Sequence, residues 1–421
     1  MNRYKTYKDS GIPWLGEVPE HWNIIQFRRV VENIKDGTHG THSRENNGFP
    51  LLSAKNVFND GIHIHDNESQ ISEEDYKLIT SNGFPRKNDL LITCVGSIGR
   101  CCVYPFDNPI AFQRSVAFLR LNKNSVPQFY KYFVESICYQ EQLRANIKLS
   151  IQGGVYLGTL VSLYVSLPPQ KEQTAIAHYL DTKLGEIDAL IGKQQTLLEK
   201  LAEQRTAVIT HAVTKGLNPA AAMKNSGMEW LGDVPEHWDI VGISKLFMLK
   251  AGGDLQPDFF SREKDDEHCY PIYTNANDEH AVYGYTSKKR FNADSITVSG
   301  RGDIGFAVYR DHDFDAIIRL LVLSPLKKLD CKYYTYSINA LLDFKFESSA
   351  VAQLSTVQLA QYKLLLPSYE EQANIAEYLD NETAKIDRLC DTVNQTIGRL
   401  KEYRTALITQ AVTGKIKVTD E

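Results

Sequence analysis

A polar loop near the start of the chain carries side chains suited to reading the edges of DNA bases. Residues 35–48 read KDGTHGTHSRENNG, a run of Thr, His, Ser, Asn and Arg bracketed by glycines. Arg and Lys suit the O6 and N7 acceptors of guanine, and Asn and Gln suit adenine N6 and N7 in the major groove. A flexible polar surface loop is the alternative for such a segment, and the loop alone does not decide between them.

Similar polar residues recur along the chain. The further candidates are Lys55, Asn56, Arg100, Gln113 and Arg114 in the first half, and Asn275, Asn277, Lys288, Lys289, Arg290 and Arg301 in the second. Lysine side chains and backbone amides bind phosphates and fix the register of a protein on DNA. Each residue taken singly is as well explained by an ordinary surface position.

The sequence lacks the motifs of the common catalytic machineries. It contains no G-x-x-x-x-G-K loop, no G-x-S-x-G elbow, no H-E-x-x-H pair and no N-P-P-[FYW] tetrapeptide. The G-x-x-G of residues 96–99 indicates a tight turn, and the acidic run 265–267 indicates a solvated loop. We therefore expect no catalytic residues and no metal site in this chain.

Composition predicts a soluble cytoplasmic protein of two to four domains. The chain has 421 residues, of which 43% are hydrophobic and 24% charged, and no apolar run approaches the length of a membrane span. The seven cysteines form no C-x-x-C pair, which favours a reducing compartment. The net charge of −5 divides into +2 for residues 1–166, 0 for 167–215, −4 for 216–365 and −3 for 366–421. If the protein binds DNA, it does so through a small local patch or with a basic partner.

One fifteen-residue segment occurs twice. Residues 10–24 read SGIPWLGEVPEHWNI and residues 226–240 read SGMEWLGDVPEHWDI, with eleven identical positions. We expect each copy to be a structural plug that seals an apolar end. In the first copy its apolar cluster is predicted to contain Trp14, Leu15, Val18 and Trp22. We expect His21 and His237 to be packed or capping residues, neither ligands nor catalytic bases.

A second repeated segment predicts two long helices. LPPQKEQTAIAHYLD (167–181) matches LPSYEEQANIAEYLD (366–380), and each is followed by a proline-free stretch ending in R-T-A-x-I-T-x-A-V-T. Apolar residues recur at spacings of three and four, as in the seam of a coiled coil. The seam residues are Ile176, Leu180, Leu184, Ile187, Ile191, Leu198, Leu201 and Val208 in the first helix, and Ile375, Leu379, Ile386, Val393, Ile397, Leu400 and Leu407 in the second. One such helix in a chain would usually form a homodimer through its apolar seam. Because this chain has two copies, we expect the two helices to pack on each other within the chain.

The stretches between the repeats, 25–166 and 241–365, predict mixed α/β domains. FPLLSAKNV, DLLITCVGSIG and SVAFLRL indicate strands, and residues 126–145 and 332–346 indicate helices. The two stretches align poorly, but CVGSIGRCCVY (94–104) is similar to SGRGDIGFAVY (299–309). Residues 36–39 have no recognisable counterpart in the second half, where GGDLQPDFF (252–260) lies instead.

The duplicated order of these segments resembles the specificity subunit of type I restriction–modification systems. The resemblance covers essentially the whole chain and is carried by W-L-G-x-V-P-x-H-W at 14–22 and 230–238 and by the two long-helix repeats. D-G-T-H (36–39), A-K-N-V (54–57) and G-S-I-G (96–99) are similar to recurrent loops of that family's target recognition domains. The resemblance implies two such domains, each reading one half of a split DNA site. It also implies an antiparallel coiled coil that separates the domains and holds two methyltransferase subunits.

The domain boundaries and partners follow from this resemblance. We expect a first recognition domain at 1–166 with its plug at 10–24, a first spacer helix at 167–215, a second recognition domain at 216–365 with its plug at 226–240, and a second spacer helix and tail at 366–421. The fold class is α/β, with a pseudo-twofold internal duplication. The chain itself would carry no cofactor; S-adenosylmethionine would belong to the methyltransferase, and ATP and magnesium to a translocase-nuclease subunit.

The predicted function is the recognition of an asymmetric bipartite target in double-stranded DNA, without catalysis. The candidate DNA contacts are Asp36, Gly37, Thr38, His39, Lys55, Asn56, Ser97, Arg100, Gln113, Arg114, Gln152, Asn275, Asn277, Lys288, Lys289, Arg290 and Arg301. The alternatives are a coiled-coil interaction scaffold with no DNA role, and a self-sufficient DNA enzyme. A scaffold would not need two divergent polar-loop domains, and an enzyme would need a cofactor or metal motif.

Overall fold

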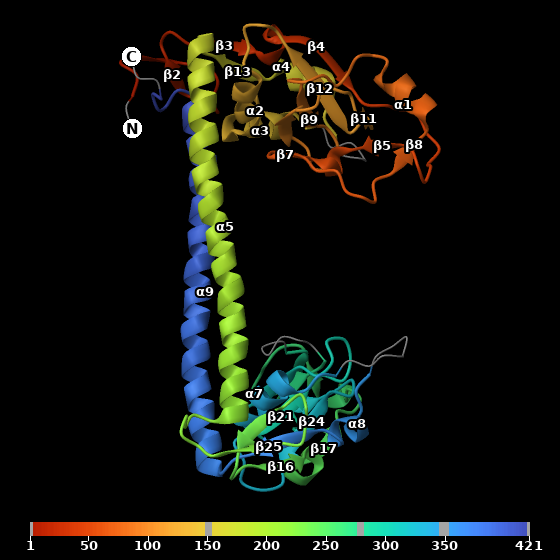
Figure 1. Ribbon diagram of the computed structural model, residues 1–421, viewed down its shortest axis with the longest axis vertical. Helices are drawn as coiled ribbons and strands as arrows, with labels where there is room; N and C mark the ends of the chain where they lie inside the picture. Colours follow the sequence, from red (N-terminus) through yellow and green to blue (C-terminus); the bar gives the residue numbers. More distant parts are fainter. Residues whose placement is uncertain (1–2, 148–153, 276–281, 345–352, 419–421) are drawn as a thin grey trace. The chain divides into compact units, whose positions relative to one another are not determined.

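The computed structural model describes residues 3–147, 154–275, 282–344 and 353–418. It divides into two compact units, one made of Met1–Gln194 with Gln395–Glu421 and the other of Gln195–Asn394 (Figure 1). Each unit holds one plug, one mixed α/β domain and stretches of both long helices.

The first unit contains thirteen of the described strands and six helices of its own. Its strands are β1 (Tyr7–Asp9), β2 (Glu17–Pro19), β3 (Asn23–Gln26), β4 (Val31–Asp36), β5 (Phe49–Leu52), β6 (Val57–Phe58), β7 (Gly61–Ile62), β8 (Gln70–Ile71), β9 (Leu90–Thr93), β10 (Cys101–Val103), β11 (Ala111–Phe112), β12 (Val116–Leu121) and β13 (Tyr164–Leu167). Its helices are the 3₁₀ helices η1 (Phe27–Arg29) and η2 (Ala54–Asn56), with α1 (Glu73–Thr80), α2 (Pro127–Glu135), α3 (Ile137–Asn146) and α4 (Leu157–Ser162).

The second unit repeats much of this order. Its described strands are β14 (Met223–Asn225), β15 (Asp233–Pro235), β16 (Asp239–Gly242), β17 (Phe247–Ala251), β18 (Phe260–Ser261), β19 (Tyr270–Tyr273), β20 (Gly284–Thr286), β21 (Ser295–Val298), β22 (Ala307–Arg310), β23 (Asp315–Ala316), β24 (Leu321–Pro325) and β25 (Lys363–Leu366). Its own helices are α6 (Ile243–Leu246), η3 (Pro257–Phe259), α7 (Cys331–Leu341) and α8 (Thr356–Ala360). The long helices α5 (Gln170–Lys215) and α9 (Tyr369–Val412) each contribute to both units.

Each domain is built on a four-stranded sheet of the same design. The strand order is β10-β9-β12-β4 in the first domain and β22-β21-β24-β17 in the second. Asp36 at the end of β4 pairs with Ala117, and Ala251 at the end of β17 pairs with Leu321. These registers align residues 112–121 of the first domain with residues 316–325 of the second, an offset of 204.

A smaller sheet stands beside each four-stranded sheet, and a two-stranded pair closes each domain. The smaller sheets have the orders β11-β5-β8 and β18-β20-β19-β23, and the closing pairs are β3 with β13 and β16 with β25. Each smaller sheet contains one parallel pair, which is β11 with β5 in the first domain and β23 with β19 in the second. The sequence prediction of mixed α/β domains is therefore confirmed.

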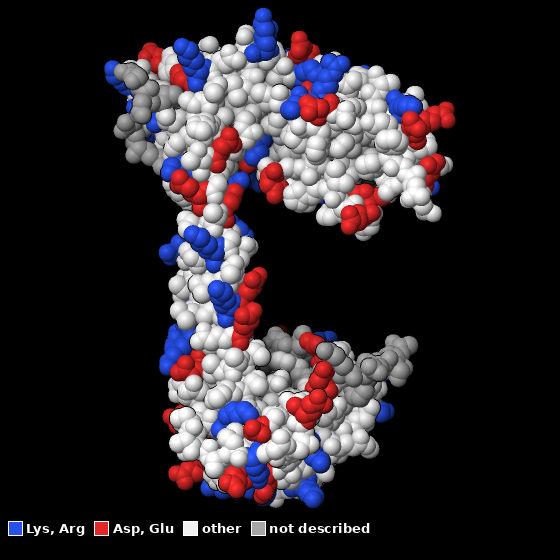
Figure 2. Space-filling model, in the orientation of Figure 1, with Lys and Arg blue, Asp and Glu red and all other residues white. Residues whose placement is uncertain are grey.

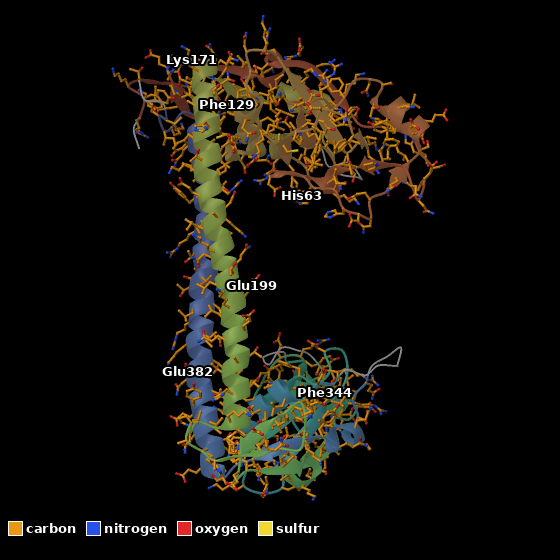
Figure 3. The ribbon with its side chains drawn as sticks, viewed as in Figure 1. His63, Phe129, Lys171, Glu199, Phe344 and Glu382 are labelled. Atoms are coloured by element: carbon orange, nitrogen blue, oxygen red, sulfur yellow. The ribbon has the colours of Figure 1, made fainter. Side chains whose placement is uncertain are left out.

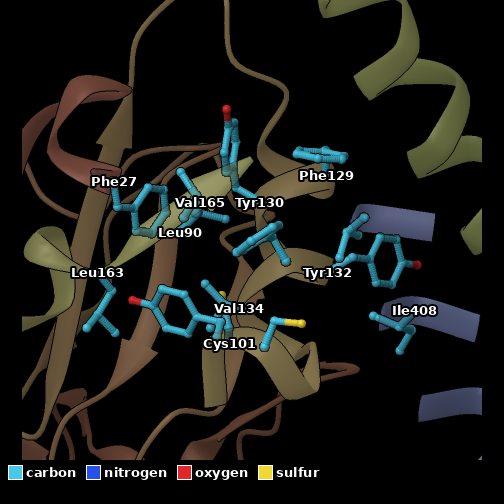
Figure 4. Packing of buried hydrophobic residues seen from close by; sticks show 14 of the residues in the cluster. Phe27, Leu90, Cys101, Phe129, Tyr130, Tyr132, Val134, Leu163, Val165 and Ile408 are labelled. Carbon is cyan, nitrogen blue, oxygen red and sulfur yellow. The ribbon is translucent and has the colours of Figure 1, made fainter. Parts of the chain in front are cut away.

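Aromatic side chains fill the core of the first unit. The rings of Phe27 and Tyr130 stack with their centroids 5.5 Å apart, and both side chains are fully buried. Figure 4 shows this cluster, with Ile408 of α9 beside Tyr132 of α2. The domain and the long helix therefore share one core, which fixes the domain on the helix.

Two of the predicted helices have different bounds in the structure. The helix predicted at 126–145 is two helices, because Ser136 has extended backbone and its hydroxyl caps α3 by accepting from the amide of Tyr139. The helix predicted at 332–346 begins at Cys331 and ends at Leu341, and residues 345 and 346 lie outside the described residues.

The first plug packs against the beginning of α5 and the end of α9. Trp22 is fully buried and donates its indole N–H to Glu172 over 3.1 Å, while His21 Nε2 lies 2.7 Å from the same carboxylate. The Tyr7 hydroxyl donates to the carbonyl of Gly414 over 3.0 Å. Trp14, which was predicted to belong to the apolar cluster, is 44% exposed, because the turn at Gly16 leaves it outside the buried group.

The second plug makes the same contacts within the second unit. Trp238 is fully buried and donates to Glu371 over 3.3 Å, and His237 lies 2.8 Å from that carboxylate. The carboxyl group accepts these bonds, and the pKa of Glu371 lies below its usual value although burial acts in the opposite direction. Both plug histidines thus bind the first turn of a long helix.

The predicted long helices form, with α5 spanning 46 residues and α9 spanning 44. In the first unit Arg404 Nε of α9 donates to Asp188 of α5 over 3.2 Å, and in the second unit Arg205 of α5 forms an ion pair with Asp387 of α9. Among the seam residues, Ile176, Leu180, Leu184, Ile187, Leu201, Ile375, Leu379, Ile386, Val393, Ile397 and Leu407 are buried, and Ile191, Leu198, Val208 and Leu400 are half-buried.

Candidate nucleic-acid interface

Three loops of the first domain meet at one edge of its sheet, and we call residues 37–38, 96–99 and 113–115 the first rim. The amide of Thr38 donates to the carbonyl of Phe112 over 2.8 Å, and the amide of Arg114 donates back to Thr38 over 3.0 Å. The amide of Cys94 donates to the carbonyl of Ser115 over 2.8 Å, which joins the loop at 96–99 to the other two. The structure thus brings together residues that lie up to 78 positions apart in the chain.

Gly37 is needed for this junction. A Cβ atom at this position would overlap the carbonyl oxygens of Phe112 and Gln113. The backbone therefore passes this point only with glycine, which explains the second residue of the D-G-T-H motif in physical terms.

The other residues of that motif are held by side chains of the same loop. Nε2 of His39 lies 2.7 Å from the carboxylate of Asp36 at the surface, and the His39 side chain is 62% exposed. Thr38 Oγ1 lies 2.8 Å from Nε2 of His42, whose other ring nitrogen lies 2.9 Å from Asp75. The motif is therefore a braced loop, and His39 is its most exposed side chain.

The turn at 96–99 is also held by a hydrogen bond from the last residue of β9. The Thr93 hydroxyl bonds to the carbonyl of Ser97, and Gly96 and Gly99 have φ of 77° and 86°. Ser97 is exposed at the tip of this turn. A turn with two left-handed residues accounts for both glycines of G-S-I-G.

Two arginines of the first domain differ in how they are held. Arg100 is half-buried and its guanidinium lies over the Phe58 ring, 4.5 Å from the centroid. Arg114 is exposed on the first rim, beside the half-buried Gln113, and within the described residues its side chain has no hydrogen bond or ion pair. Arg114 is thus available to a phosphate or a base edge.

Lys55 and Asn56 lie around a buried carboxylate instead. Asn56 is fully buried and donates to Glu68 over 2.5 Å, and Lys55 Nζ lies 2.8 Å from the same group. Burial opposes the ionisation of Glu68, but these two contacts outweigh it, so the pKa of Glu68 lies below its usual value. Asn56 therefore supports the loop and does not reach the surface, contrary to its prediction as a DNA contact.

We call residues 252–253, 302–305 and 317–319, which follow the matching strands of the second domain, the second rim. The amide of Gly253 donates to the carbonyl of Ala316 over 3.1 Å, and the amide of Ile318 donates to Gly253 over 3.1 Å. Both bonds match those of Thr38, whose amide donates to Phe112 and whose carbonyl accepts from the amide of Arg114. Residues 36–39 have no counterpart recognisable from the sequence, yet Gly252 and Gly253 hold the backbone positions of Gly37 and Thr38.

The cations predicted near the second rim are mostly paired. Arg290 forms a bidentate ion pair with Asp315, with Nη2 2.9 Å from Oδ2, and its guanidinium fills the space where a Cβ of Gly253 would lie. Lys289 pairs with Asp313, and Lys288 lies 3.6 Å from the centroid of the Phe259 ring. Pairing with carboxylates lowers the local positive potential that these residues were predicted to supply.

Asn275 and Arg301 have different surroundings. The Asn275 amide donates to the carbonyl of Ile318 over 2.7 Å and accepts from the amide of Gly300 over 2.7 Å, so both ends hold backbone. Arg301 is exposed and bonds to Gln353 over 3.3 Å. Gln152 and Asn277 lie outside the described residues.

The turn of the second rim repeats that of the first. The Ser299 hydroxyl bonds to the carbonyl of Asp303, and Gly302 and Gly305 have φ of 72° and 91°. Phe344, labelled in Figure 3, packs over Gly305 so closely that a Cβ there would overlap its ring. The similarity of residues 94–104 to 299–309 therefore reflects a shared turn.

Neither unit presents one continuous basic surface on the face seen in Figure 2. Lys and Arg side chains alternate there with Asp and Glu side chains on both units. This agrees with the net charge of −5 and with binding through a small patch, since an exposed arginine such as Arg114 acts only locally.

The described residues show no site for a metal ion and no membrane helix. No group of three or more His, Cys, Asp or Glu in that part of the chain is arranged to hold a metal. All seven cysteines are free, and burial raises the pKa of the Cys94 and Cys102 thiols to about 12. No helix among the described residues is long and apolar enough to cross a membrane.

Comparison with known proteins identifies relatives along nearly the whole chain. A putative type I restriction enzyme specificity subunit of Methanocaldococcus jannaschii is 25% identical over 96% of this chain and 96% of its own length. The EcoKI specificity subunit of Escherichia coli is 21% identical over 95% of this chain and 90% of its own length. A putative type I specificity subunit of Mycoplasma pneumoniae is 34% identical over 31% of this chain and 38% of its own.

Solved structures share the fold. A chain from a structural study of the assembly and conformational transition of a type I restriction–modification system matches with a TM-score of 0.73 at 14% identity, over 95% of this chain and 99% of that one. The HsdS subunit from Thermoanaerobacter tengcongensis matches with a TM-score of 0.55 at 15% identity, over 95% and 98% of the two chains.

The family model described as the type I restriction modification DNA specificity domain matches residues 19–200 and 235–398, one copy for each half of the duplication. These two copies cover more than half of the chain; each begins within a plug, includes a rim and ends within a long helix. The chain belongs to the family of type I restriction–modification specificity subunits, the non-catalytic component of those systems.

Proposed function

We propose that this chain reads an asymmetric, bipartite target in double-stranded DNA, with one half-site for each rim. The observation that carries the proposal is that the two rims have the same backbone hydrogen bonds but present different side chains. Thr38 and Arg114 stand in the first rim where Gly253 and Ile318 stand in the second. Two recognition surfaces on one frame suit two unlike half-sites, since base contacts specify sequence while the frame sets position.

We further propose that α5 and α9 form an antiparallel coiled coil that fixes the gap between the half-sites. The order of the ion pairs supports this, because Asp188 early in α5 pairs with Arg404 late in α9, and Arg205 late in α5 pairs with Asp387 early in α9. The buried apolar seam supports it as well. Half-site spacing on a duplex follows from such geometry.

The proposed partners are two methyltransferase subunits and the translocase-nuclease subunits of a full complex. The duplicated plugs and helices support two equivalent docking sites, one for each methyltransferase. The methyltransferase would supply S-adenosylmethionine and flip the target adenine, and the translocase-nuclease would supply ATP and magnesium chemistry. No step of that chemistry is assigned to residues of this chain.

Selection from a randomised duplex pool tests the proposal. The full chain, co-purified with its methyltransferase subunits, is expected to enrich a split consensus with two unlike halves and one fixed gap. A well-folded complex that enriches no sequence would contradict DNA recognition and favour an interaction scaffold.

Lengthening both long helices tests the spacer. Seven residues inserted after Gln194 and seven after Asn394 keep the heptad register and add about 10.5 Å to each helix. The selected gap is expected to grow by about three base pairs, given about 3.4 Å per base pair. An unchanged gap would contradict the spacer, and a single insertion in α5 alone serves as the mismatched control.

A further inference from the structure

Two adjacent residues of the second rim have an unusual backbone. Ile318 and Arg319, between β23 and β24, have φ of 53° and 56°, in the left-handed region. Non-glycine residues are uncommon there, and a β-branched residue such as isoleucine is a genuine outlier. Such conformations persist only where the surroundings fix them, and they gather at functional sites.

The surroundings of this pair do fix its backbone. The amide of Ile318 donates to the carbonyl of Gly253, and its carbonyl accepts from the side chain of Asn275. Asn275 is itself held by the amide of Gly300, and the amide of Leu320 donates to Ile317 over 3.2 Å. The strained conformation therefore belongs to the frame of the rim.

The side chains of the pair are exposed in this conformation. Ile318 is 47% exposed, and Arg319 is exposed with no hydrogen bond or ion pair to its side chain in the part of the chain that the structure describes. Glycine would adopt the same backbone without strain. Exposed side chains on a strained backbone, at positions where glycine would be unstrained, point to a use outside the folded chain.

The first rim presents an arginine from the same loop without this strain. The offset of 204 aligns Ile318 with Arg114 and Arg319 with Ser115, and neither first-rim residue has a positive φ. The two rims therefore offer an exposed arginine from adjacent positions, with an apolar neighbour only in the second. Lys289 and Arg290 cannot replace Arg319 as the free cation of this rim, because carboxylates pair with both.

We propose that Ile318 and Arg319 are the specificity-determining contacts of the second half-site, an inference that rests on the proposed DNA recognition. Ile318 contacts the C5-methyl group of a thymine in the major groove, the one apolar group that base edges present there. Arg319 binds a backbone phosphate beside it and fixes the loop in the groove.

The Ile318→Gly variant separates this role from a structural one. Glycine removes the contact and relieves the strain, so the melting temperature is expected to equal or exceed that of the wild type. In duplex selection with the full chain and its methyltransferase subunits, one T·A preference of roughly tenfold is expected to disappear from one half-site only. Arg319→Ala is expected to weaken binding for all sequences and to reduce the salt slope by about one.

Two further variants complete the test. Ile318→Asn introduces a residue that tolerates the left-handed region, and it is expected to shift the preference at the same base pair instead of removing it. Asn88→Gly, at an exposed left-handed residue of the first domain away from its rim, is expected to leave both half-sites unchanged.

The outcomes distinguish the two levels of the proposal. A wild type that selects a split site while Ile318→Gly and Ile318→Asn select the identical site would overturn this inference and leave the proposed function standing. Loss of preference in both half-sites by a folded Ile318→Gly chain would also overturn it. No selected site for the wild type would overturn the proposed function itself.

Discussion

The plugs and the rims of the two halves differ in how far they have diverged. Glu172 and Glu371 each bind the His–Trp pair of their own plug, with nearly equal distances. The buried amides of Gln173 and Gln372 each donate to a proline carbonyl over 2.9 Å. The contacts that hold each domain on its helix are thus preserved while the rim side chains are not.

Two matching hydrogen bonds, Tyr132–Asp181 and Tyr336–Asp380, also join each domain to a long helix. Each tyrosine hydroxyl donates to a carboxylate of a long helix, over 2.6 Å and 2.8 Å. Mutations in the frame should therefore affect stability in both halves alike, whereas mutations in a rim should affect one half-site.

The largest effect is expected for the buried plug tryptophans. Trp22→Ala and Trp238→Ala each remove a fully buried side chain and its indole hydrogen bond, so each should lower the free energy of unfolding of its unit by about 3–5 kcal/mol. Urea denaturation with unit-specific limited proteolysis measures this. Trp14→Ala, at a 44% exposed position, is the control and should cost less than about 1 kcal/mol. Equal effects of Trp14→Ala and Trp22→Ala would contradict the plug geometry.

A smaller effect, confined to binding, is expected for Arg114→Ala. The side chain is exposed and unpaired within the described residues, so stability should change little while DNA affinity falls by about 1–3 kcal/mol. Duplex selection should show relaxed or weakened preference in the first half-site only. Equal losses in both half-sites would indicate that the substitution disturbs the fold.

A buried charge makes the first half differ from the second in its pH dependence. Burial raises the pKa of Glu135, and ion pairs with Lys131 at 2.5 Å and Arg404 at 3.7 Å offset this only in part. Asn339, a neutral amide, holds the corresponding position and bonds to the backbone of Ala307. Only the first half should therefore show this titration.

The sign follows from linkage. Because the folded-state pKa of Glu135 is raised, protonation of Glu135 favours the folded state. This contribution to the free energy of unfolding is complete below the unfolded pKa, and it is lost as pH rises above about 4.5 through the folded pKa. The stability of Glu135→Gln relative to wild type should rise across that window, as measured by urea denaturation from pH 4 upward. A difference that stays constant with pH would show that Glu135 keeps its ordinary pKa.

The sequence predicted the repeated parts well because their signals are local. Heptad spacing predicted two long helices within 167–215 and 366–421, where α5 and α9 form, and the repeated tryptophans located both plugs. The break at Ser136 was missed because a cap depends on one hydroxyl within an otherwise helical pattern.

The rims were predicted less completely because they assemble from distant loops. Gly252 and Gly253 match Gly37 and Thr38 through strand pairing, which sequence identity does not reveal. Asn56 was chosen for its side-chain chemistry, yet it bonds to a buried carboxylate. Ile318 and Arg319 carry no sequence signal, since their backbone angles follow from tertiary contacts.

A graft tests most directly the claim that one frame carries two independent reading surfaces. Residues 243–362 are replaced by a second copy of residues 27–163, joined at the closing strand pairs where Gln26 pairs with Tyr164 and Gly242 with Lys363. Duplex selection with the folded graft is predicted to yield a symmetric target made of two inverted copies of the first half-site. A folded graft that still selects the original second half-site, or that selects none, would contradict the account.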